Sequence, residues 1–288
     1  RDSQGGKAVN LLPSDSPQDI YSDVAQRATA LLEKEGTLMA RQLLDVGVCR
    51  KITKRSVMIV PYSGTRHACR SYIQEALAEK CKGRNPWNDE FFQPALYLSG
   101  FVWQAISEVI VSAFEAMNYI KDIAKLYVDN GISFHWKTPT NIIVRQYYPN
   151  SKKKRVQSHL NGSMIRLSYR EADENTIDSR KMLSAASPNF VHSLDAASLT
   201  LTVDKCLDKG IVDFAMVHDS YATHSPNMPK LNNELRDAFV AMYEDNDVLH
   251  DLYTNAVTTL PEGVDVPPPP KRGSLDLKEV LKSDYFFA

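Results

Sequence analysis

The sequence predicts an α+β fold that is mostly helical and has a central β-hairpin. Long stretches carry apolar residues at three- and four-residue spacing and end at glycines, a pattern typical of amphipathic helices. Residues 152–169 surround an Asn161-Gly162 pair, which favours a type I′ hairpin turn. Residues 211–224 form two short extended runs that meet at Asp219, and these runs predict the central hairpin.

Composition excludes several classes of protein. A chain of 288 residues with 43% hydrophobic content can form one large domain or two ordinary ones. A net charge of −1 means that any surface for a polyanion is a local patch. The four cysteines form no C-x-x-C pair, so we expect reduced thiols and neither a disulfide framework nor a zinc site. Without a run of about 18 apolar residues or a signal peptide, we expect no membrane or secretory segment.

Helix signals follow one another along the chain. Residues 1–13 are expected to be the end of an interrupted element and a loop. Ser16 is the predicted N-cap of a first helix, with Pro17 at its first position and an end near Gly36. After a loop at 83–89, the apolar residues 91–128 are expected to be helical core. The other predicted helices cover residues 39–46, 68–80, 188–209, 232–243, 245–253 and 275–282, with an extended proline-rich spacer at 261–270.

The segment 49–64 is rich in cations. Arg50, Lys54 and Met58 are spaced by four residues and therefore share one face of a predicted helix. An arginine and a lysine one turn apart suit a triphosphate, and Tyr62 follows on the same slowly winding stripe. The alternative is a solvated basic helix face, but apolar residues occupy the other sides of this helix and leave little surface to solvate.

Asp219 ends the first run of the central hairpin. A tight turn there would lift its carboxylate out of an apolar layer into a cleft. A carboxylate is a suitable oxygen ligand for Mg²⁺. The alternative is a turn aspartate that satisfies its own backbone.

The segments 135–139 and 142–148 are expected to be strands, and the residues after them form the Asn161-Gly162 hairpin. A twisted two-stranded ribbon fits the major groove of DNA, where arginine, glutamine, asparagine and histidine can read base edges. The alternative is a basic surface hairpin without a ligand.

The spacing Arg50-x3-Lys54-x7-Tyr62 resembles the nucleotide-binding helix of the right-hand polymerases. The string at 53–58 together with Tyr62 is similar to the single-subunit, phage-type DNA-dependent RNA polymerases. Further matches follow the order of that family at residues 8–13, 18–21, 115–118, 135–139, 188–193, 218–220 and 281–288.

The resemblance implies roles for particular residues. It implies two Mg²⁺ ions, with Asp219 as a metal ligand, sugar discrimination by Tyr62, and a hydrogen bond from His192 to the ribose 2′-OH or to the group that makes it. The implied catalytic residues are Asp219, Lys54, Tyr62 and His192. The implied nucleotide-binding residues are Arg50, Lys54, Arg55, Met58 and Tyr62. By position in the hairpin, the implied promoter readers are Arg155, Gln157, His159, Arg166 and Ser168.

The sequence departs from the family pattern near Tyr62. The family usually has Tyr-Gly where this chain has Tyr62-Ser63, with Gly64 one place later. Pro61 lacks a backbone donor and is expected to bend the helix just before Tyr62. Leu194 stands where the family commonly has glutamine.

The resemblance also implies right-hand polymerase fingers and a partial palm. It assigns residues 1–12 to the end of a first palm segment and residues 13–187 to the fingers, with a specificity hairpin at 140–172. It assigns residues 188–288 to the second half of the palm and a C-terminal foot, with the last aromatic residues and the α-carboxylate near the active site. In the family a first metal aspartate precedes the Arg1-Asp2 string, and this chain starts without Met. We therefore expect an upstream segment or a second subunit to supply that aspartate, and no polymerase activity from this chain alone.

The expected partners are promoter and template DNA, the RNA product and ribonucleoside triphosphates, in the cytoplasm of an infected bacterium. A DNA polymerase of the same right-hand class is one alternative, although the 152–169 hairpin and His192 count against it. A non-catalytic DNA-binding module is a second alternative, and a mitochondrial member of the family is a third.

Overall fold

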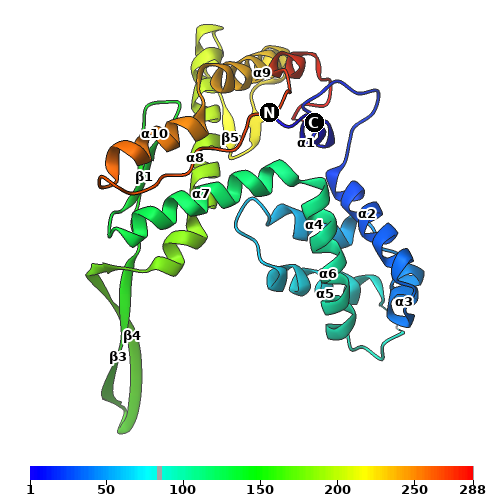
Figure 1. Cartoon of the computed structure of the whole chain (residues 1–288), viewed down its shortest axis with the longest axis vertical. Coiled ribbons are helices and arrows are strands. Elements are labelled where there is room, and N and C mark those ends of the chain that lie inside the picture. The colour runs from blue at the N-terminus through cyan, green and yellow to red at the C-terminus, as the bar shows by residue number, and fades with distance from the viewer. Residues whose placement is uncertain (83–85, 288) are drawn as a thin grey trace.

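The computed structural model describes residues 1–82 and 86–287. Two groups of helices lie on either side of the long helix α7 (Val111–Asp129), and a two-stranded ribbon projects away from both groups (Figure 1). The predicted mostly helical α+β fold is confirmed, since the described strands form three separate two-stranded antiparallel sheets. Residues 83–85 of the expected loop and Ala288 lie outside the described residues.

The first group of helices shares one hydrophobic core, which we call core one. Its fully buried members include Val24, Leu43, Ile52, Ile73 and Leu98. They come in turn from α2 (Ile20–Glu35), α3 (Leu38–Val46), α4 (Arg50–Met58), α5 (Arg66–Lys80) and α6 (Phe92–Val109).

Helix α2 ends at Gly36, as predicted, in the left-handed conformation with φ of 64°. The predicted N-cap at Ser16 is wrong, because the helix begins at Ile20 with Asp19 as its cap. The side chain of Asn10 explains the later start. Its amide accepts from Gln18 N at 2.7 Å and donates to Gln18 O at 3.1 Å, which holds both backbone groups of Gln18 outside the helix.

The apolar stretch 91–128 is helical, as expected, but it divides at Ile110 into α6 and α7, whose axes differ by 93°. The bend serves two cores. Ile106 of α6 belongs to core one, whereas Ile120 and Ile123 of α7 belong to a second cluster. Among the described residues, no single helix is long and apolar enough to cross a membrane, and only the bent pair α6–α7 passes that test, by length and composition.

The second cluster, core two, joins α7 to the long helix α8 (Ser179–Asp208), to β1 (Phe134–Lys137) and to α10 (Val248–Thr259). Trp136 of β1 lies at its centre, 1% exposed, and its indole donates to Ser193 Oγ of α8 at 2.8 Å. β1 pairs with β2 (Ile143–Gln146), and both strands lie largely within the segments expected to be strands.

The predicted start of α8 at Pro188 is wrong. The helix starts nine residues earlier, with Asp178 as its N-cap, and Pro188 lies inside it. Met182 and Ala186 are fully buried in the turns before Pro188. Their packing offsets the one hydrogen bond that the proline removes, which costs about 3 kcal/mol in an exposed helix.

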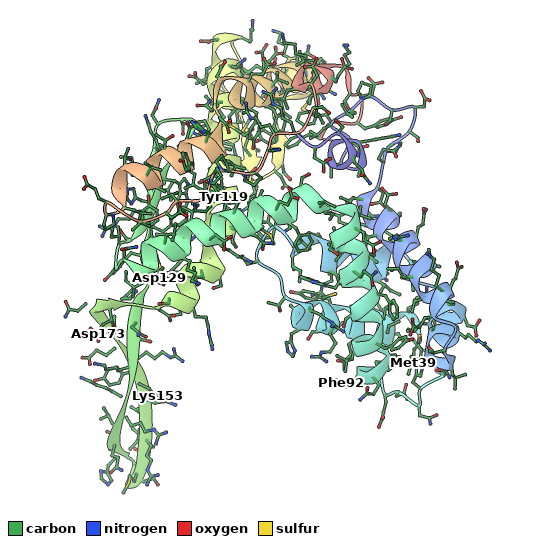
Figure 2. The ribbon with its side chains drawn as sticks, viewed as in Figure 1. Met39, Phe92, Tyr119, Asp129, Lys153 and Asp173 are labelled. Carbon is green, nitrogen blue, oxygen red and sulfur yellow. The ribbon has the colours of Figure 1, made fainter. Side chains whose placement is uncertain are left out.

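The projecting ribbon consists of β3 (Pro149–Leu160) and β4 (Ser163–Ile177). Asn161 and Gly162 form its turn with φ of 49° and 79°, so the predicted type I′ hairpin is confirmed. The ribbon extends beyond the predicted hairpin, since β4 continues to Ile177. Figure 2 shows Lys153 and Asp173 on the ribbon, far from the helices that carry Met39 and Phe92.

The remaining elements lie near both chain ends (Figure 1). They are α1 (Ser3–Ala8), β5 (Ala215–Val217), β6 (Ser220–Ala222), the 3₁₀ turn η1 (Ser225–Asn227), α9 (Met228–Asp245) and the 3₁₀ helix η2 (Leu277–Lys282). The C-terminal segment packs on the start of the chain. Leu275 N donates to Arg1 O at 3.2 Å, and a Cβ at Gly273 would lie 1.9 Å from Arg1 O, so only glycine fits there.

Candidate active site

Helix α4 presents a cationic face beside a buried one. Ile52, Thr53 and Val57 are buried against core one, and the Thr53 hydroxyl donates to Tyr21 O of α2 at 2.7 Å. The opposite face carries Arg50, Lys54 and Met58, as the spacing predicts.

The two cations of this face meet one aromatic ring. The guanidinium of Arg50 lies 5.2 Å and the ammonium of Lys54 5.9 Å from the ring centroid of Tyr21. Cations within about 6 Å of an aromatic face are attracted to it. Arg50 Nε also donates to Asp19 Oδ2 at 2.8 Å, whereas no described carboxylate lies within ion-pair distance of Lys54.

The third predicted nucleotide-binding cation, Arg55, faces helix α5. It forms an ion pair with Glu75 and lies 4.4 Å from the ring centroid of Tyr72. Arg50, Lys54 and Arg55 nevertheless border one open hollow of about 810 Å³ between α4 and α5. At the rim of this hollow, Arg50 and Arg55 are paired with carboxylates, whereas Lys54 has no described carboxylate partner.

The chain turns sharply after α4. The expectation that Pro61 bends a continuing helix is wrong, because α4 ends at Met58. Pro61 cannot donate a backbone hydrogen bond, and its neighbours form tighter i−3 bonds: Val60 N to Val57 O and Tyr62 N to Ile59 O, both at 3.1 Å.

Ser63 and Gly64, the residues of the departure from Tyr-Gly, both lie in this turn. Ser63 has φ of 59°, a conformation that glycine adopts without strain, and its buried hydroxyl has no partner among the described residues. Gly64 is needed for a different reason, since a Cβ there would lie 2.6 Å from Ile59 O.

Tyr62 stacks on His192 of α8. The ring centroids are 4.9 Å apart with an interplanar angle of 13°, and Tyr62 is 45% exposed. Partial burial, together with the negative charges of Asp195 and Asp219 and the neighbouring Tyr21, raises the pKa of Tyr62. The phenol is therefore protonated at neutral pH and free to donate a hydrogen bond.

The hairpin β5–β6 brings Asp219 to the same place. His218 lies 6.5 Å from His192, centroid to centroid, and adopts φ of 52° in the hairpin turn, which leaves the adjacent Asp219 exposed. The Asp219 carboxylate accepts no hydrogen bond from any described residue, so the alternative of a turn aspartate that satisfies its own backbone gains no support. Tyr221 of β6 packs edge-on against Phe287 at 5.3 Å, which puts the last described aromatic residue next to this hairpin.

The described residues offer few ligands for a metal. Asp219 is an accessible oxygen donor, and Mg²⁺ can be held by one or two protein carboxylates and substrate phosphates. No group of three or more histidine, cysteine, aspartate or glutamate side chains in the described part of the chain could hold a metal ion. Asp219 therefore fits one ligand position of a magnesium site and does not complete such a site.

The predicted promoter readers lie on one face of the ribbon. In the register, Arg155 pairs with Ser168 and Gln157 with Arg166, while His159 pairs with Met164. Directly paired residues, and residues two apart, share a face of a ribbon. Lys153 and Arg170 pair on the same face.

The two faces of the ribbon differ in charge. On the opposite face Lys152 lies 3.3 Å from Asp173, and Lys154 forms an ion pair with Glu171. Among the described residues, no carboxylate pairs with Arg155 or Arg166. The cations on the face of the predicted readers are therefore available to an anionic ligand.

The structure thus gathers part of the predicted site and separates another part. Contacts and charges link Arg50 and Lys54 through Tyr21 to Tyr62, His192 and Asp219. The ribbon that carries the predicted promoter readers instead projects away from the helices (Figure 1). Five residues without an expected role also contact or charge this region: Asp19, Tyr21, Ser187, Asp195 and His218. Only Asp195, one helical turn after His192, and His218, next to Asp219, could have been suggested by spacing.

Comparison with known proteins identifies the family. The family model for DNA-dependent RNA polymerase matches residues 1–264, so the chain belongs to that family and the resemblance of its motifs is confirmed. It is 33% identical over 333 residues to the DNA-directed RNA polymerase of Enterobacteria phage T3, covering 100% of this chain and 38% of that protein.

T7 RNA polymerase of Escherichia phage T7 is 33% identical over 337 residues, with 100% and 38% of the two chains covered. The mitochondrial DNA-directed RNA polymerase 1 of Nicotiana sylvestris is 32% identical over 295 residues, with 100% and 28% covered. The chain thus spans less than two fifths of these relatives.

The ion pair between Asp19 and Arg50 should make the free energy of unfolding depend on pH. Partial burial alone would raise the pKa of Asp19, but hydrogen bonds from Ser22 and Arg50 and the charge of Arg50 lower it below its ordinary value. A lowered folded-state pKa contributes stability above about pH 4, and this contribution is lost as the pH falls through the folded value. Asn is an equally good N-cap, so Asp19→Asn can keep the capping bond from Tyr21 N, whereas it removes the charge and the second oxygen, which accepts from Ser22 and Arg50.

We therefore expect Asp19→Asn to lower the free energy of unfolding by about 0.5–1 kcal/mol at pH 7, a value discounted for solvent exposure. The difference from the parent chain should shrink below about pH 4. Urea unfolding at pH 7 and pH 3 measures it, with the exposed Asp15→Asn as control. A difference that stays constant with pH would contradict the assignment.

The strain at Ser63 gives a prediction of opposite sign. Ser63→Gly removes the left-handed conformation of a non-glycine residue and an unpartnered hydroxyl, so it should raise the free energy of unfolding by up to about 1 kcal/mol. The control Ser107→Gly, on the exposed side of α6, should lower it by about 0.5 kcal/mol. Chemical denaturation of both variants checks the signs, and a loss of stability in Ser63→Gly would refute the strain.

Proposed function

We propose that this chain is a catalytic portion of a DNA-directed RNA polymerase that extends RNA from ribonucleoside triphosphates. The observation that carries the proposal is the stack of Tyr62 on His192. It joins the cations of α4 to α8 and to the β5–β6 hairpin with Asp219, and family membership supports the same reading.

In this proposal Arg50 and Lys54 hold the triphosphate. Arg50 would exchange the carboxylate of Asp19 for a phosphate, and Lys54, which has no described carboxylate partner, would contact the phosphates directly. Arg55 and Met58 would line the nucleotide site. Tyr62 and His192 would read the sugar, since a phenol and an imidazole can both hydrogen-bond a hydroxyl.

Asp219 would hold metal. Two Mg²⁺ ions would stabilise the attacking and leaving oxygens of an in-line displacement. Because no group of three or more metal-ligating side chains exists among the described residues, we propose that an upstream segment or a second subunit contributes another carboxylate, and that this chain by itself does not polymerise.

The proposal also divides the chain into the subdomains of a right-hand polymerase. Residues 1–12 would belong to a first palm segment, 13–187 to the fingers and 188–288 to the rest of the palm. The similarity to phage polymerases supports the proposal that the protein functions in the cytoplasm of an infected bacterium. The similarity to a plant mitochondrial polymerase supports the alternative, a function in an organelle.

The ribbon would read promoter DNA with the face that carries Arg155, Gln157, His159, Arg166 and Ser168. Unpaired cations on that face support it. The ribbon taken alone would equally support a non-catalytic DNA-binding module, which would have no use for Asp219.

Loss of Asp219 separates these two functions. In the complete polymerase that contains this chain, Asp219→Ala should lower templated RNA synthesis at least about a hundredfold, since a metal ligand contributes several kcal/mol to the transition state. Promoter binding should persist. Asp213→Ala, an exposed carboxylate six residues earlier, should retain activity. Equal loss of binding and synthesis in Asp219→Ala would make this residue structural.

The ribbon is tested by cations on its two faces. Arg155→Ala and Arg166→Ala should each weaken promoter binding about tenfold, as loss of a base or phosphate contact does. Lys154→Ala removes a cation already neutralised by Glu171 and should have a smaller effect. Binding to promoter and unrelated duplexes at one fixed salt concentration measures both. Equal effects of the three variants would rule out the proposed face.

A further inference from the structure

The hydroxyl of Ser187 in helix α8 bonds to a distant segment of the chain. Side-chain hydroxyls within a helix usually donate to a carbonyl three or four residues earlier. On α8 four do so: Ser184, Ser193, Thr200 and Thr202. Ser187 is fully buried and donates instead to the carbonyl oxygen of Pro61, 126 residues earlier, at 3.0 Å. This bond ties α8 to the turn that follows α4.

The bond holds the peptide unit that leads into Tyr62. The carbonyl of Pro61 and the N–H of Tyr62 belong to one planar peptide. Ser187 holds the oxygen, and Ile59 O accepts from the nitrogen at 3.1 Å. The pyrrolidine ring of Pro61 also restricts the backbone angle φ of Pro61. Both polar atoms of the peptide are therefore held, and the direction in which the chain enters Tyr62 depends on Ser187.

The same helix also contacts the Tyr62 side chain. His192 lies five residues after Ser187, about 7.5 Å along the helix axis, and stacks on the phenol at 4.9 Å. Backbone and ring of Tyr62 are thus positioned by one rigid element. The turn depends on such support, since the residue after Tyr62 has a strained backbone and an unpartnered buried hydroxyl.

We propose that Ser187 is a positioning residue for sugar selection. Its hydroxyl holds Tyr62 against His192 and so sets how strongly the enzyme prefers ribonucleotides to deoxyribonucleotides. The inference rests on the proposed function, in which Tyr62 and His192 read the sugar. Ser187 itself acts only through the Pro61 carbonyl and does not touch the nucleotide.

The geometric part is tested on the purified chain without any activity. The face of the Tyr62 ring shifts the NMR signals of the His192 ring protons, and Tyr62→Ala defines the spectrum without that shift. Ser187→Ala should move the His192 signals toward the Tyr62→Ala positions. Ser184→Ala, whose hydroxyl bonds within its own helix, should leave them in place. A Ser187→Ala spectrum in which the His192 signals match the parent would overturn the inference.

The functional part uses the complete polymerase and compares incorporation of ribo- and deoxyribonucleotides. Ser187→Ala should lower the ratio of the two kcat/KM values about fivefold, corresponding to the loss of one hydrogen bond. Ser187→Thr keeps the hydroxyl and should restore most of the ratio, which a purely structural role would not require. Added to Tyr62→Phe, Ser187→Ala should cause no further loss, because both act through the same ring.

The Tyr62→Phe and Ser187→Ala variants distinguish a failure of the proposed function from a failure of the inference about Ser187. If Tyr62→Phe leaves the ratio unchanged, the proposed role of Tyr62 in sugar reading fails and the inference fails with it. If Tyr62→Phe lowers the ratio but Ser187→Ala does not, only the inference fails. Should Ser187→Ala prove too unstable to assay, Ser187→Cys keeps the volume with a weaker donor and should give an intermediate ratio, and a parental ratio in that variant would overturn the inference.

Discussion

The stack of Tyr62 on His192 is the contact on which the candidate active site depends. The two rings come from segments that adjoin different hydrophobic cores: Tyr62 follows α4, which packs in core one, and His192 lies on α8, which packs in core two. His218 then lies beside His192 and brings the hairpin of Asp219 to the same region. Because each core is close-packed and resists deformation, a single ring contact and one hydrogen bond can fix the spacing between α4 and α8.

The arrangement of ion pairs decides which cations remain available. On α4, Lys51 and Arg55 are neutralised by Glu79 and Glu75 of α5, whereas Lys54 meets only the ring of Tyr21 among its described charged and aromatic neighbours. The ribbon repeats this pattern, with paired lysines on one face and unpaired arginines on the other. Exposed ion pairs of this kind add little to stability. Their main consequence is that the unpaired cations of α4 and of the ribbon lie on one face of each element.

Local chemistry made much of the fold predictable. The Asn161-Gly162 turn, the end of α2 at Gly36 and the shared face of Arg50 and Lys54 follow from backbone preferences and helical spacing within a few residues. The errors have non-local causes. Helix α2 starts late because Asn10, eight residues away, binds both backbone groups of Gln18. Helix α8 continues through Pro188 because buried packing before it outweighs the lost hydrogen bond, and the bend at Ile110 serves two cores.

The sequence by itself determined the family, the helical character and five members of the candidate site, because these depend on residue type and order. Only the tertiary structure decided which partners those residues have: Asp19 for Arg50, Tyr21 for Lys54, and Ser187 and His192 for the turn that carries Tyr62. The bond between Ser187 and Pro61 joins residues 126 positions apart. No local preference encodes such a pair, because the two residues meet only after both cores have packed and brought α4 and α8 together.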